Sequence, residues 1–410
     1  MLNFKRNDLC LEDVKLSSLA EKFQTALYVY SKKQLLENFR SYKDACGKET
    51  LICFACKTNS NAAILKLLAN EGAGADTTSG GEIFRCLSAG FSPSKIVYAG
   101  VGKTAEEIEY ALKNKIFMFN VESFEELAAI DKIAAKLKTK TRFAFRVNPD
   151  VDPSTHSYIK TGKKGTKFGI PIEDAVNAYL NAKKYKNVEA LGIHSHIGSQ
   201  ILDIKPFKEA ALKIKKTISE IEKNGLRIEY INCGGGLGIA YQKSQKAPLP
   251  SKLFSEIFNV FKGENRKFIF EPGRSIAANA GHLLCKVIYR KKSGGKSFLI
   301  TDAAMNDLIR PTLYEAYHDI IPVKKSAAKK VKSDIVGPIC ESGDFLGKDR
   351  MLPVLAQGEY LLITCAGAYG AAMSSQYNSR PMLAEVLVDG ASAKLIRKRN
   401  SYKDLLFNEM

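Results

Sequence analysis

The chain lacks the long apolar runs that cross membranes, because no stretch of its 410 residues approaches the roughly eighteen consecutive apolar residues of a spanning helix. Its first residues, Met1 to Arg6, also lack the apolar core of a secretion signal. Its nine cysteines are an odd number without a framework of spacings, which favours reduced, buried thiols over disulfides. We therefore expect a cytoplasmic protein that does not enter a membrane.

The basic charge of the chain is not arranged as nucleic-acid-binding surfaces arrange it. The net charge is +19, yet the lysines are spread along the chain and no run interleaves them with aromatic residues. The densest cluster, Lys324 to Lys332, stands beside a predicted turn. We interpret the charge as solvated surface that secondarily attracts anionic substrates, and we expect no nucleic-acid partner.

Apolar runs and helical patterns alternate through the first 275 residues, in a chain that is too long for one ordinary core. The predicted strands are at residues 51–57, 73–78, 95–100, 116–121, 141–148, 188–196, 228–234 and 267–272. The predicted helices are at residues 32–43, 61–70, 80–89, 104–113, 123–137, 172–183, 206–224 and 251–262. Eight strands alternating with eight helices predict a parallel (β/α)₈ barrel of the TIM type.

From Ser275 onward the pattern changes to short alternating strands. These strands are predicted at Leu283–Tyr289, Ser297–Thr301, Asp319–Val323, Tyr360–Cys365, Leu383–Val388 and Ala393–Ile396. The change of pattern predicts a separate C-terminal β-rich domain.

Polar residues concentrate at the carboxyl ends of the predicted barrel strands, where this fold carries its chemistry. They are Lys57, Asp76, Arg146, Asn148, His194, His196, Gly234, Gly235, Gly236, Glu271 and Arg274. Lys57 ends a strand that is buried on both faces, so its ammonium must find a counter-charge or lose its proton. A lone lysine there is more often a surface residue. Because the other strand ends also carry polar residues, we interpret Lys57 as a nucleophilic amine.

The glycines at 234–236 follow a strand and, without side chains, allow consecutive backbone N–H groups to close on an anion such as phosphate. The dinucleotide fingerprint is excluded because Ile239 stands where a third glycine is needed. Ser199 offers a hydroxyl that could help to hold a phosphate. The glycine run therefore predicts a phosphate site of another kind.

His194 and His196 lie two residues apart, on one face of their predicted strand. Such a pair could ligate a metal, as in metal-dependent hydrolases, but the chain has only five histidines and no third ligand at a telling spacing. An imidazole can also stack on an aromatic cofactor ring. Glu271 and Arg274 leave one strand end together, and for them a structural ion pair is the simpler interpretation.

A lysine amine, a glycine nest, a carboxylate for a ring nitrogen and a flat imidazole together describe a pyridoxal-phosphate site. Seven motifs, in chain order, make the sequence similar to the diaminopimelate decarboxylase family, which belongs to the alanine-racemase-like (fold type III) pyridoxal-phosphate enzymes. The motifs are Cys-Lys57-Thr-Asn-Ser-Asn, Gly-Ile-His-Ser-His196-Ile-Gly-Ser-Gln, Asn-Cys-Gly-Gly-Gly-Leu-Gly, Phe-Glu271-Pro-Gly-Arg274, Arg310-Pro-Thr-Leu-Tyr314, Cys340-Glu341-Ser-Gly-Asp and Gly-Ala-Tyr369-Gly-Ala. The resemblance covers nearly the whole chain.

The resemblance implies decarboxylation of meso-2,6-diaminopimelate to L-lysine and carbon dioxide, the last step of lysine biosynthesis, with pyridoxal 5'-phosphate as cofactor. It implies that Lys57 holds the cofactor as an imine, that Glu271 faces the ring nitrogen and that His196 stacks on the ring. The other residues that it assigns to the cofactor are Asp76, Ser199, Gly235, Gly236, Arg274 and Tyr369.

The resemblance also places substrate residues in the β domain. Arg310 offers a fork for a carboxylate, Tyr314 a hydroxyl and Glu341 a counter-charge for the distal amine. Cys340 is the implied proton donor, although alone it would more often be a buried thiol. Arg274 and Tyr369 are expected to reach the substrate as well.

The family is built as a homodimer in which each site combines the barrel of one subunit with the Cys340 segment of its partner. In the family the N-terminal segment joins the β domain, so Ala26–Tyr30 is expected to be one of its strands. The implied domains are a barrel at residues 31–275, and a β domain formed by residues 1–30 and 276–410.

Three alternative functions differ from the diaminopimelate decarboxylase hypothesis in the residues, domains or ligands that they require. An ornithine or arginine decarboxylase of the same fold would keep the cofactor residues but need not keep Arg310 and Tyr314. A non-catalytic cofactor carrier would consist of a barrel without the β domain. A metal-dependent barrel hydrolase would bind a metal, whereas we expect none.

Overall fold

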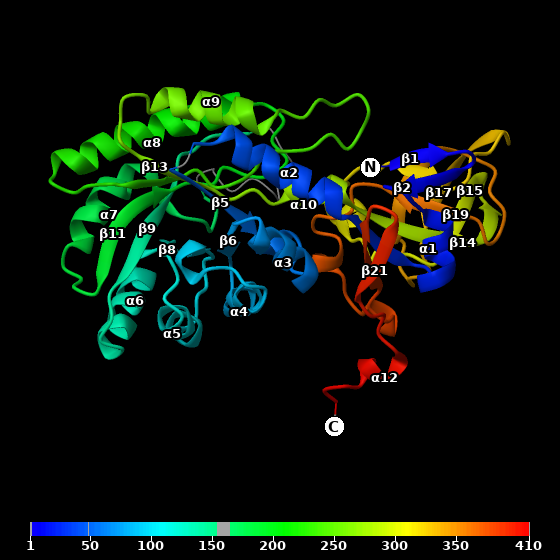
Figure 1. The fold of residues 1–410 in the computed structure, drawn as a ribbon, viewed down its shortest axis with the longest axis horizontal. Helices are drawn as coiled ribbons and strands as arrows, with labels where there is room; N and C mark the ends of the chain where they lie inside the picture. Colours follow the sequence, from blue (N-terminus) through cyan, green and yellow to red (C-terminus); the bar gives the residue numbers. More distant parts are fainter. Residues whose placement is uncertain (1, 48, 154–164, 410) are drawn as a thin grey trace. The chain divides into compact units, whose positions relative to one another are not determined.

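The computed structural model describes residues 2–47, 49–153 and 165–409 (Figure 1). It divides into two compact units. The first, here called the barrel unit, comprises Phe39–Ile239 and Lys246–Ser275. The second, the β unit, comprises Met1–Asn38, Ala240–Gln245 and Ile276–Met410. The implied domain boundaries at residues 30/31 and 275/276 stay predictions, because compact packing does not test whether each part folds alone.

The barrel unit contains a closed parallel barrel. Its strands are β5 (Thr50–Ala55), β6 (Gly74–Thr77), β7 (Ile96–Tyr98), β8 (Met118–Val121), β9 (Thr141–Asn148), β11 (Val188–His194), β12 (Tyr230–Asn232) and β13 (Lys267–Phe270). Each strand pairs in parallel with the next, and β13 pairs with β5 to close the ring. A two-residue strand, β10 (Ile170–Pro171), adds to β9. The predicted (β/α)₈ fold is confirmed.

Helices follow the barrel strands and lie around them (Figure 1). They are α3 (Ala62–Asn70), α4 (Gly80–Ser88), α5 (Ala105–Lys113), α6 (Phe124–Lys136), α7 (Ala175–Ala182), α8 (Lys205–Lys223) and α9 (Pro250–Val260). Four of them begin at a side chain that accepts a backbone N–H of the first turn, namely Asn61, Ser79, Thr104 and Ser123. These caps end the loops after β5 to β8 and so fix the loops that carry the polar strand-end residues.

The β unit is organised around a mixed sheet. Its strand order is β18 (Phe345–Pro353), β17 (Lys330–Val336), β15 (Lys296–Thr301), β14 (Gly281–Ser293), β4 (Leu27–Ser31), β20 (Ala384–Asp389) and β21 (Ser392–Arg397). β19 (Tyr360–Ile363) also pairs with β14, and β16 (Ile320–Pro322) pairs with β19. β4 pairs with β14 and β20, so the N-terminal segment joins this sheet as the resemblance implied.

The N-terminal segment adds three short strands and a helix to the β unit, namely β1 (Leu2–Lys5), β2 (Asp8–Leu11), β3 (Val14–Lys15) and α1 (Leu16–Phe23). Their apolar side chains pack with those of the large sheet, in a cluster that includes Leu9, Leu16, Val29, Leu284 and Val386. A further helix, α2 (Lys32–Ala45), divides between the two units at Asn38.

Strands β17 and β18 were not predicted from the sequence. β17 begins at Lys330, inside the lysine cluster that we interpreted as solvated surface beside a turn. Lys330 and Lys332 are exposed, whereas Ser333 and Ile335 are buried. The two lysines at the start of this strand are in water, and they hide the apolar alternation on which strand prediction depends.

Among the described residues, no helix combines the length and the apolar character that crossing a membrane requires.

Candidate active site

Lys57 lies directly after β5, on one turn of 3₁₀ helix formed by Cys56–Thr58. Asn59 closes this turn by donating its N–H to the carbonyl of Cys56. The Lys57 side chain remains 38% exposed, and its Nζ donates a hydrogen bond to Oδ2 of Asp76 at the end of the neighbouring strand β6. The ammonium expected to need a counter-charge thus has one.

Asp76 is completely buried. Burial, and after it the charge of Glu271, raise the pKa of its carboxyl to about 7 against the opposing effect of Lys57. A carboxyl that titrates near neutral pH can both accept and release a proton. Beside an amine it can orient that amine and hold its proton, which suits a lysine that must act as a nucleophile.

Glu271 follows β13 and is buried, yet it is held as a carboxylate. Burial alone would raise its pKa, but the nearby His194 and Lys57 lower it below the ordinary range. Nδ2 of Asn232 donates to its Oε1 at 2.6 Å, and Nδ2 of Asn120 donates to the same atom at 3.0 Å. Nε2 of His194 lies 3.4 Å from Oε2. The result is a fixed negative charge at the barrel end.

The glycine run after β12 has a backbone that other residues cannot adopt. Gly234 and Gly236 have φ of +63° and +116°, and a Cβ on Gly235 would lie 2.1 Å from the Glu271 carbonyl oxygen. The N–H of Gly234 donates to Oδ1 of Asn232, and that of Gly235 donates to Nδ1 of His196. These two N–H groups already serve side chains, because the left-handed turn at Gly234 bends the backbone toward them. The predicted phosphate nest, to which Gly235 and Gly236 belong, stays a prediction.

His196 lies beyond the end of β11, in the loop, so it does not share a strand face with His194 as we had expected. Its Nδ1 accepts the Gly235 N–H at 3.1 Å. Burial, together with the charges of Arg146 and Lys57, holds its pKa well below the usual range. His196 is therefore a neutral, half-buried ring that keeps its proton on Nε2.

The two histidines of the H-x-H pair have separate partners, Glu271 for His194 and Gly235 for His196. In the part of the chain that the structure describes, His, Cys, Asp and Glu side chains form no cluster of three suited to a metal ion.

Arg274 begins the short helix α10 (Arg274–Ala277) and is buried. Its Nη2 and Nε donate to Oγ of Ser199 at 2.9 and 3.2 Å. A guanidinium and a hydroxyl predicted to serve one phosphate are thus brought together from two different strand ends.

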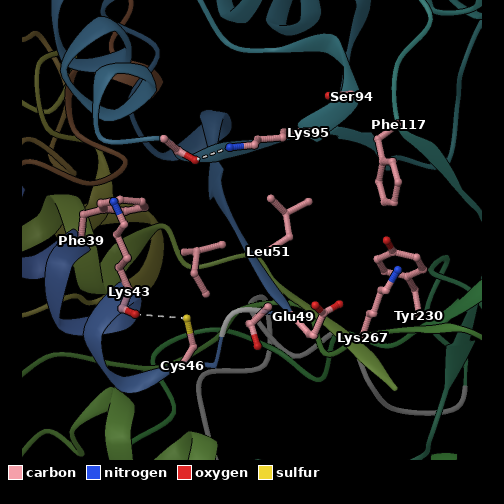
Figure 2. Close-up of a pocket in the computed structure, with 13 residues that line it drawn as sticks. Phe39, Lys43, Cys46, Glu49, Leu51, Ser94, Lys95, Phe117, Tyr230 and Lys267 are labelled. Atoms are coloured by element: carbon pink, nitrogen blue, oxygen red, sulfur yellow. Dashed lines mark hydrogen bonds between the residues drawn. The ribbon is translucent and has the colours of Figure 1, made fainter. Parts of the chain in front are cut away.

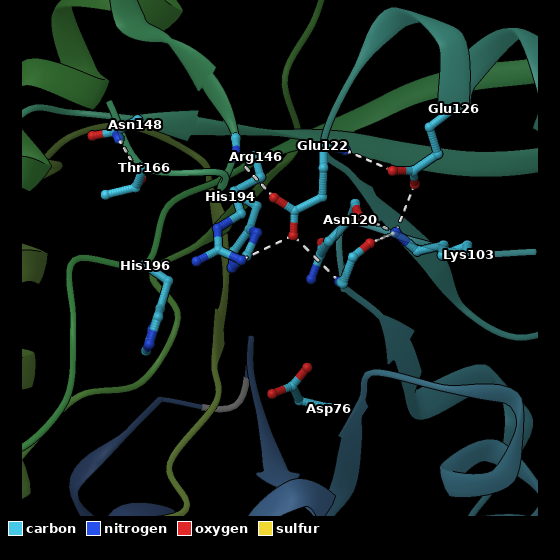
Figure 3. A network of polar contacts seen from close by, with 12 residues as sticks. Asp76, Lys103, Asn120, Glu122, Glu126, Arg146, Asn148, Thr166, His194 and His196 are labelled. Carbon is cyan, nitrogen blue, oxygen red and sulfur yellow. Dashed lines mark hydrogen bonds and ion pairs between the residues drawn. The ribbon is translucent and has the colours of Figure 1, made fainter. Parts of the chain in front are cut away.

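A buried charge network, formed by Lys103, Glu122, Glu126 and Arg146, supports this end of the barrel (Figure 3). Arg146 at the end of β9 donates to Glu122 at 2.9 Å. Lys103 donates to Glu126 at 2.6 Å and to the carbonyl of Asn120 at 2.9 Å. The network fixes the loops after β7 and β8, and the Arg146 charge helps to keep His196 neutral.

We predicted Arg146 as a site residue from the sequence but did not predict Glu122, Asn120 or Asn232. The signal was present, since Asn120 and Glu122 stand at the end of the predicted strand 116–121 and Asn232 lies within 228–234. An asparagine near a strand end is common in turns, so only the partner across the barrel reveals its role.

The remaining predicted site residues belong to the β unit. Arg310 and Tyr314 are the first and last residues of α11 (Arg310–Tyr314); Arg310 is buried and Tyr314 half-buried. Cys340 and Glu341 are exposed on the loop between β17 and β18. The predicted residues therefore divide between the units, with Tyr369 also in the second.

A hollow of about 350 Å³ lies at the end of the barrel where the strands begin (Figure 2). Lys57 follows the other end of β5. Its lining comes from helix α2 and from residues at or near the starts of strands, which include Thr50, Leu51, Phe117, Tyr230 and Lys267. It contains none of the predicted site residues. This end of a (β/α)₈ barrel usually serves stability, and the chemistry is expected at the other end.

Comparison with known proteins gives consistent results. A family model described as pyridoxal-dependent decarboxylase, pyridoxal binding domain, matches residues 32–278. A diaminopimelate decarboxylase of Aquifex aeolicus is 51% identical, over 98% of this chain and 95% of that protein. That of Zymomonas mobilis is 48% identical, over 99% and 98%.

Solved structures agree with these relatives. The crystal structure of diaminopimelate decarboxylase from Helicobacter pylori complexed with L-lysine is 43% identical, with a TM-score of 0.92 over 96% of this chain and 98% of that one. A viral arginine decarboxylase, from Paramecium bursaria Chlorella virus, is 20% identical with a TM-score of 0.81 over 91% and 98%. The latter likeness shows the fold alone.

Proposed function

The chain belongs to the diaminopimelate decarboxylase family of pyridoxal-dependent enzymes, and on this premise we propose that it removes carbon dioxide from meso-2,6-diaminopimelate to give L-lysine, the last step of lysine biosynthesis. The observation that carries the proposal is identity of about half over nearly the full length, which includes both units. The reported complex of a relative with L-lysine supports the same product.

The residues at the barrel end fit pyridoxal phosphate. Lys57 offers a primary amine, Glu271 a fixed carboxylate, and Arg274 with Ser199 a cationic and hydroxyl pair for a phosphate. Nδ1 of His194 and Oδ1 of Asn120 are buried without a hydrogen-bond partner among the described residues. Unsatisfied buried polar atoms are costly in a closed core and are common around functional sites.

The chain's own groups then have separate tasks. Pyridoxal phosphate, when bound, supplies the electron sink for the electrons released as carbon dioxide leaves. Lys57 would hold the cofactor through its amine, and Asp76 would orient that amine and take up its proton. Glu271 holds a proton on the ring nitrogen. His196, neutral and flat, packs against the ring.

In the β unit, Arg310 binds the distal carboxylate, the Tyr314 hydroxyl donates a hydrogen bond to it, and Glu341 pairs with the distal amine. Cys340 gives a proton to the carbon that has lost its carboxyl group. Tyr369 with Gly235 and Gly236 contributes to phosphate binding, and Arg274 and Tyr369 also reach the substrate. The exposed thiol of Cys340 supports a role for it outside the core.

We also propose a homodimer whose sites join the barrel of one subunit, residues 31–275, to the Cys340 segment of its partner's β domain. Lys57→Ala and Cys340→Ala homodimers are then each nearly inactive, but a mixed dimer contains one intact site. Subunit exchange between the variants is expected to restore up to about a quarter of wild-type activity per subunit. Verified mixed dimers that stayed inactive would rule out shared sites.

A cytoplasmic location is part of the proposal, supported by nine cysteines that are all unpaired in the structure. The function itself is tested by a visible absorption spectrum of the purified protein, followed by assays on diaminopimelate, ornithine and arginine. Cofactor absorbance with turnover of diaminopimelate alone is expected. Preferred turnover of ornithine or arginine would assign the chain to another decarboxylase, and metal-dependent hydrolysis without cofactor absorbance would refute the proposal.

A further inference from the structure

Arg310 is held by a chain of hydrogen bonds inside the β unit. Its Nη1 donates to Nε2 of His318 at 2.8 Å, and Nδ1 of His318 lies 2.8 Å from the carbonyl oxygen of Thr364. Arg310 is 5% exposed and His318 is 0% exposed. The imidazole thus connects the guanidinium to the backbone just beyond β19.

The partners of His318 fix its protonation. A carbonyl oxygen can only accept, so the Nδ1 that faces Thr364 carries a proton. A guanidinium can only donate, so the Nε2 that faces Arg310 must present a lone pair. Both contacts are satisfied only by the neutral ring with its proton on Nδ1.

Tyr241 supports the same guanidinium from another side. The Arg310 Cζ lies 5.0 Å from the centre of the Tyr241 ring, within the range of a cation–π contact. The His318 ring meets the Tyr241 ring nearly at right angles, with centres 5.3 Å apart. Together, Tyr241, His318 and Thr364 form what we call the Arg310 clamp.

We infer that His318 is a positioning residue that aims the Arg310 fork, and that the clamp thereby sets the preference for ligands with a distal carboxylate. This inference rests on the proposed function, which gives Arg310 its ligand. A bidentate contact needs the fork held within roughly 10–20° of the productive direction, and a long arginine side chain does not keep that direction by itself. When the guanidinium plane rotates away from the plane of the carboxylate, both of its hydrogen bonds to that carboxylate weaken together.

The role can be separated from simple core packing with two substitutions. In His318→Asn, the amide can still donate to the Thr364 carbonyl but leaves Arg310 without this acceptor. In His318→Gln, the longer side chain carries an oxygen to the position of Nε2 and restores an acceptor for Arg310. The pair therefore removes and rescues the one bond in question.

The measurement is calorimetric binding of L-lysine and of cadaverine to the holoenzyme. Loss of one carboxyl group from diaminopimelate leaves the other amino-acid centre intact, so L-lysine keeps the carboxylate that Arg310 would hold and cadaverine lacks it. We expect His318→Asn to reduce the preference for L-lysine about tenfold, the value of one charge-assisted hydrogen bond. His318→Gln is expected to stay within about threefold of wild type.

Steady-state kinetics give an independent readout. His318→Asn is expected to raise KM for diaminopimelate about tenfold, with kcat and the cofactor absorbance nearly unchanged. If Asn and Gln variants lose L-lysine and cadaverine binding equally, or lose only thermal stability, His318 is a packing residue and the inference is wrong.

Tyr241→Leu tests the clamp without replacing either partner of the Arg310–His318 bond or of the His318–Thr364 bond, and it serves if the His318 variants do not fold. It is expected to weaken L-lysine binding about threefold and to leave cadaverine binding unchanged; equal binding of L-lysine by wild type and variant would contradict the clamp. A wild-type holoenzyme that prefers L-lysine to cadaverine but does not act on diaminopimelate would refute the proposed function and leave the clamp standing.

Discussion

The carboxyl end of the barrel and the loops of the β unit hold their candidate residues in opposite ways. In the barrel unit, Asp76 and Glu271 are buried among cross-strand partners, and Lys57 reaches out from them. In the β unit, Cys340 and Glu341 are exposed on a loop. The difference follows the chemistry proposed for each. Tuning a charge needs burial and fixed neighbours, whereas meeting a substrate or a second subunit needs an accessible surface.

Arg310 is the exception in the β unit, because it is buried and clamped like a barrel residue. A carboxylate ligand that is bound by a fork needs a fixed direction, which a flexible loop does not provide. Burial therefore follows the need for fixed geometry more closely than it follows the division into units.

The largest expected effect belongs to the barrel end. Lys57→Ala is expected to abolish cofactor absorbance and to lower turnover at least about a thousandfold, because the covalent attachment is lost. Lys66→Ala, which alters an exposed lysine on the neighbouring helix α3, is the matched control and is expected to behave as wild type. Borohydride reduction that still fixed the cofactor to the Lys57→Ala chain would show that another residue is the nucleophile.

The contrast in burial predicts a contrast in stability. The Lys103 side chain is 1% exposed, and Lys103→Met leaves the Glu126 carboxylate buried without this cation. We expect the variant to lose about 3–5 kcal/mol of unfolding free energy in urea titrations. Lys332→Met breaks an exposed pair with Asp349 in the β unit and is expected to cost less than about 1 kcal/mol. Equal losses in the two variants would mean that the buried network does not stabilise the barrel.

The barrel itself could be predicted from the sequence because its strands are buried on both faces and read as continuous apolar runs separated by capped helices. The N-terminal strand β4 could not be placed by periodicity, since its pairing with β14 joins residues about 250 positions apart, and only the family resemblance supplied it. Strand β17 was hidden because two of its first three residues, Lys330 and Lys332, are exposed lysines.

The predicted site residues were accessible to sequence reasoning where a strand end marked them, as for Lys57 and Glu271. Their partners were not, because Asn120 and Asn232 matter only through a contact with Glu271 across the barrel. Likewise, Tyr241 lies 69 positions before Arg310, and the sequence around either residue does not predict their cation–π contact. The roles of the predicted residues stay predictions, and substitutions of Lys57, Cys340 and Arg310 test them.

A moderate effect is expected from Arg310→Lys. An ammonium cannot reproduce a planar fork on a carboxylate, so KM for diaminopimelate should rise about ten- to a hundredfold while cofactor absorbance stays unchanged. The preference for L-lysine over cadaverine should fall in parallel. A variant that kept the wild-type preference would show that Arg310 does not bind the substrate. Arg310 would then no longer be an exception among the substrate residues of the β unit.

The smallest effect concerns a buried carboxyl in the β unit, and it tests whether burial acts there as it does in the barrel. Asp307 stands three residues before Arg310, and its Oδ2 accepts the N–H of Ala304 at 2.9 Å. Burial raises its pKa to about 7, as it does for Asp76, although its backbone hydrogen bond opposes the shift. Because the folded pKa exceeds the ordinary value of 3.8, the folded state binds more protons than the unfolded state between about pH 4 and 7.

The stability that Asp307 contributes is therefore complete below about pH 4 and is lost as the pH rises through 7. Asp307→Asn stays neutral and avoids this loss, so the Tm of wild type relative to the variant should fall by a few degrees between pH 4.5 and 7.5. Asp349→Asn, at an exposed position, controls for the removal of a charge. A wild-type Tm that kept a constant offset from Asp307→Asn across this range would show that Asp307 is not held protonated in the fold, and buried carboxyls in the two units would then differ in kind.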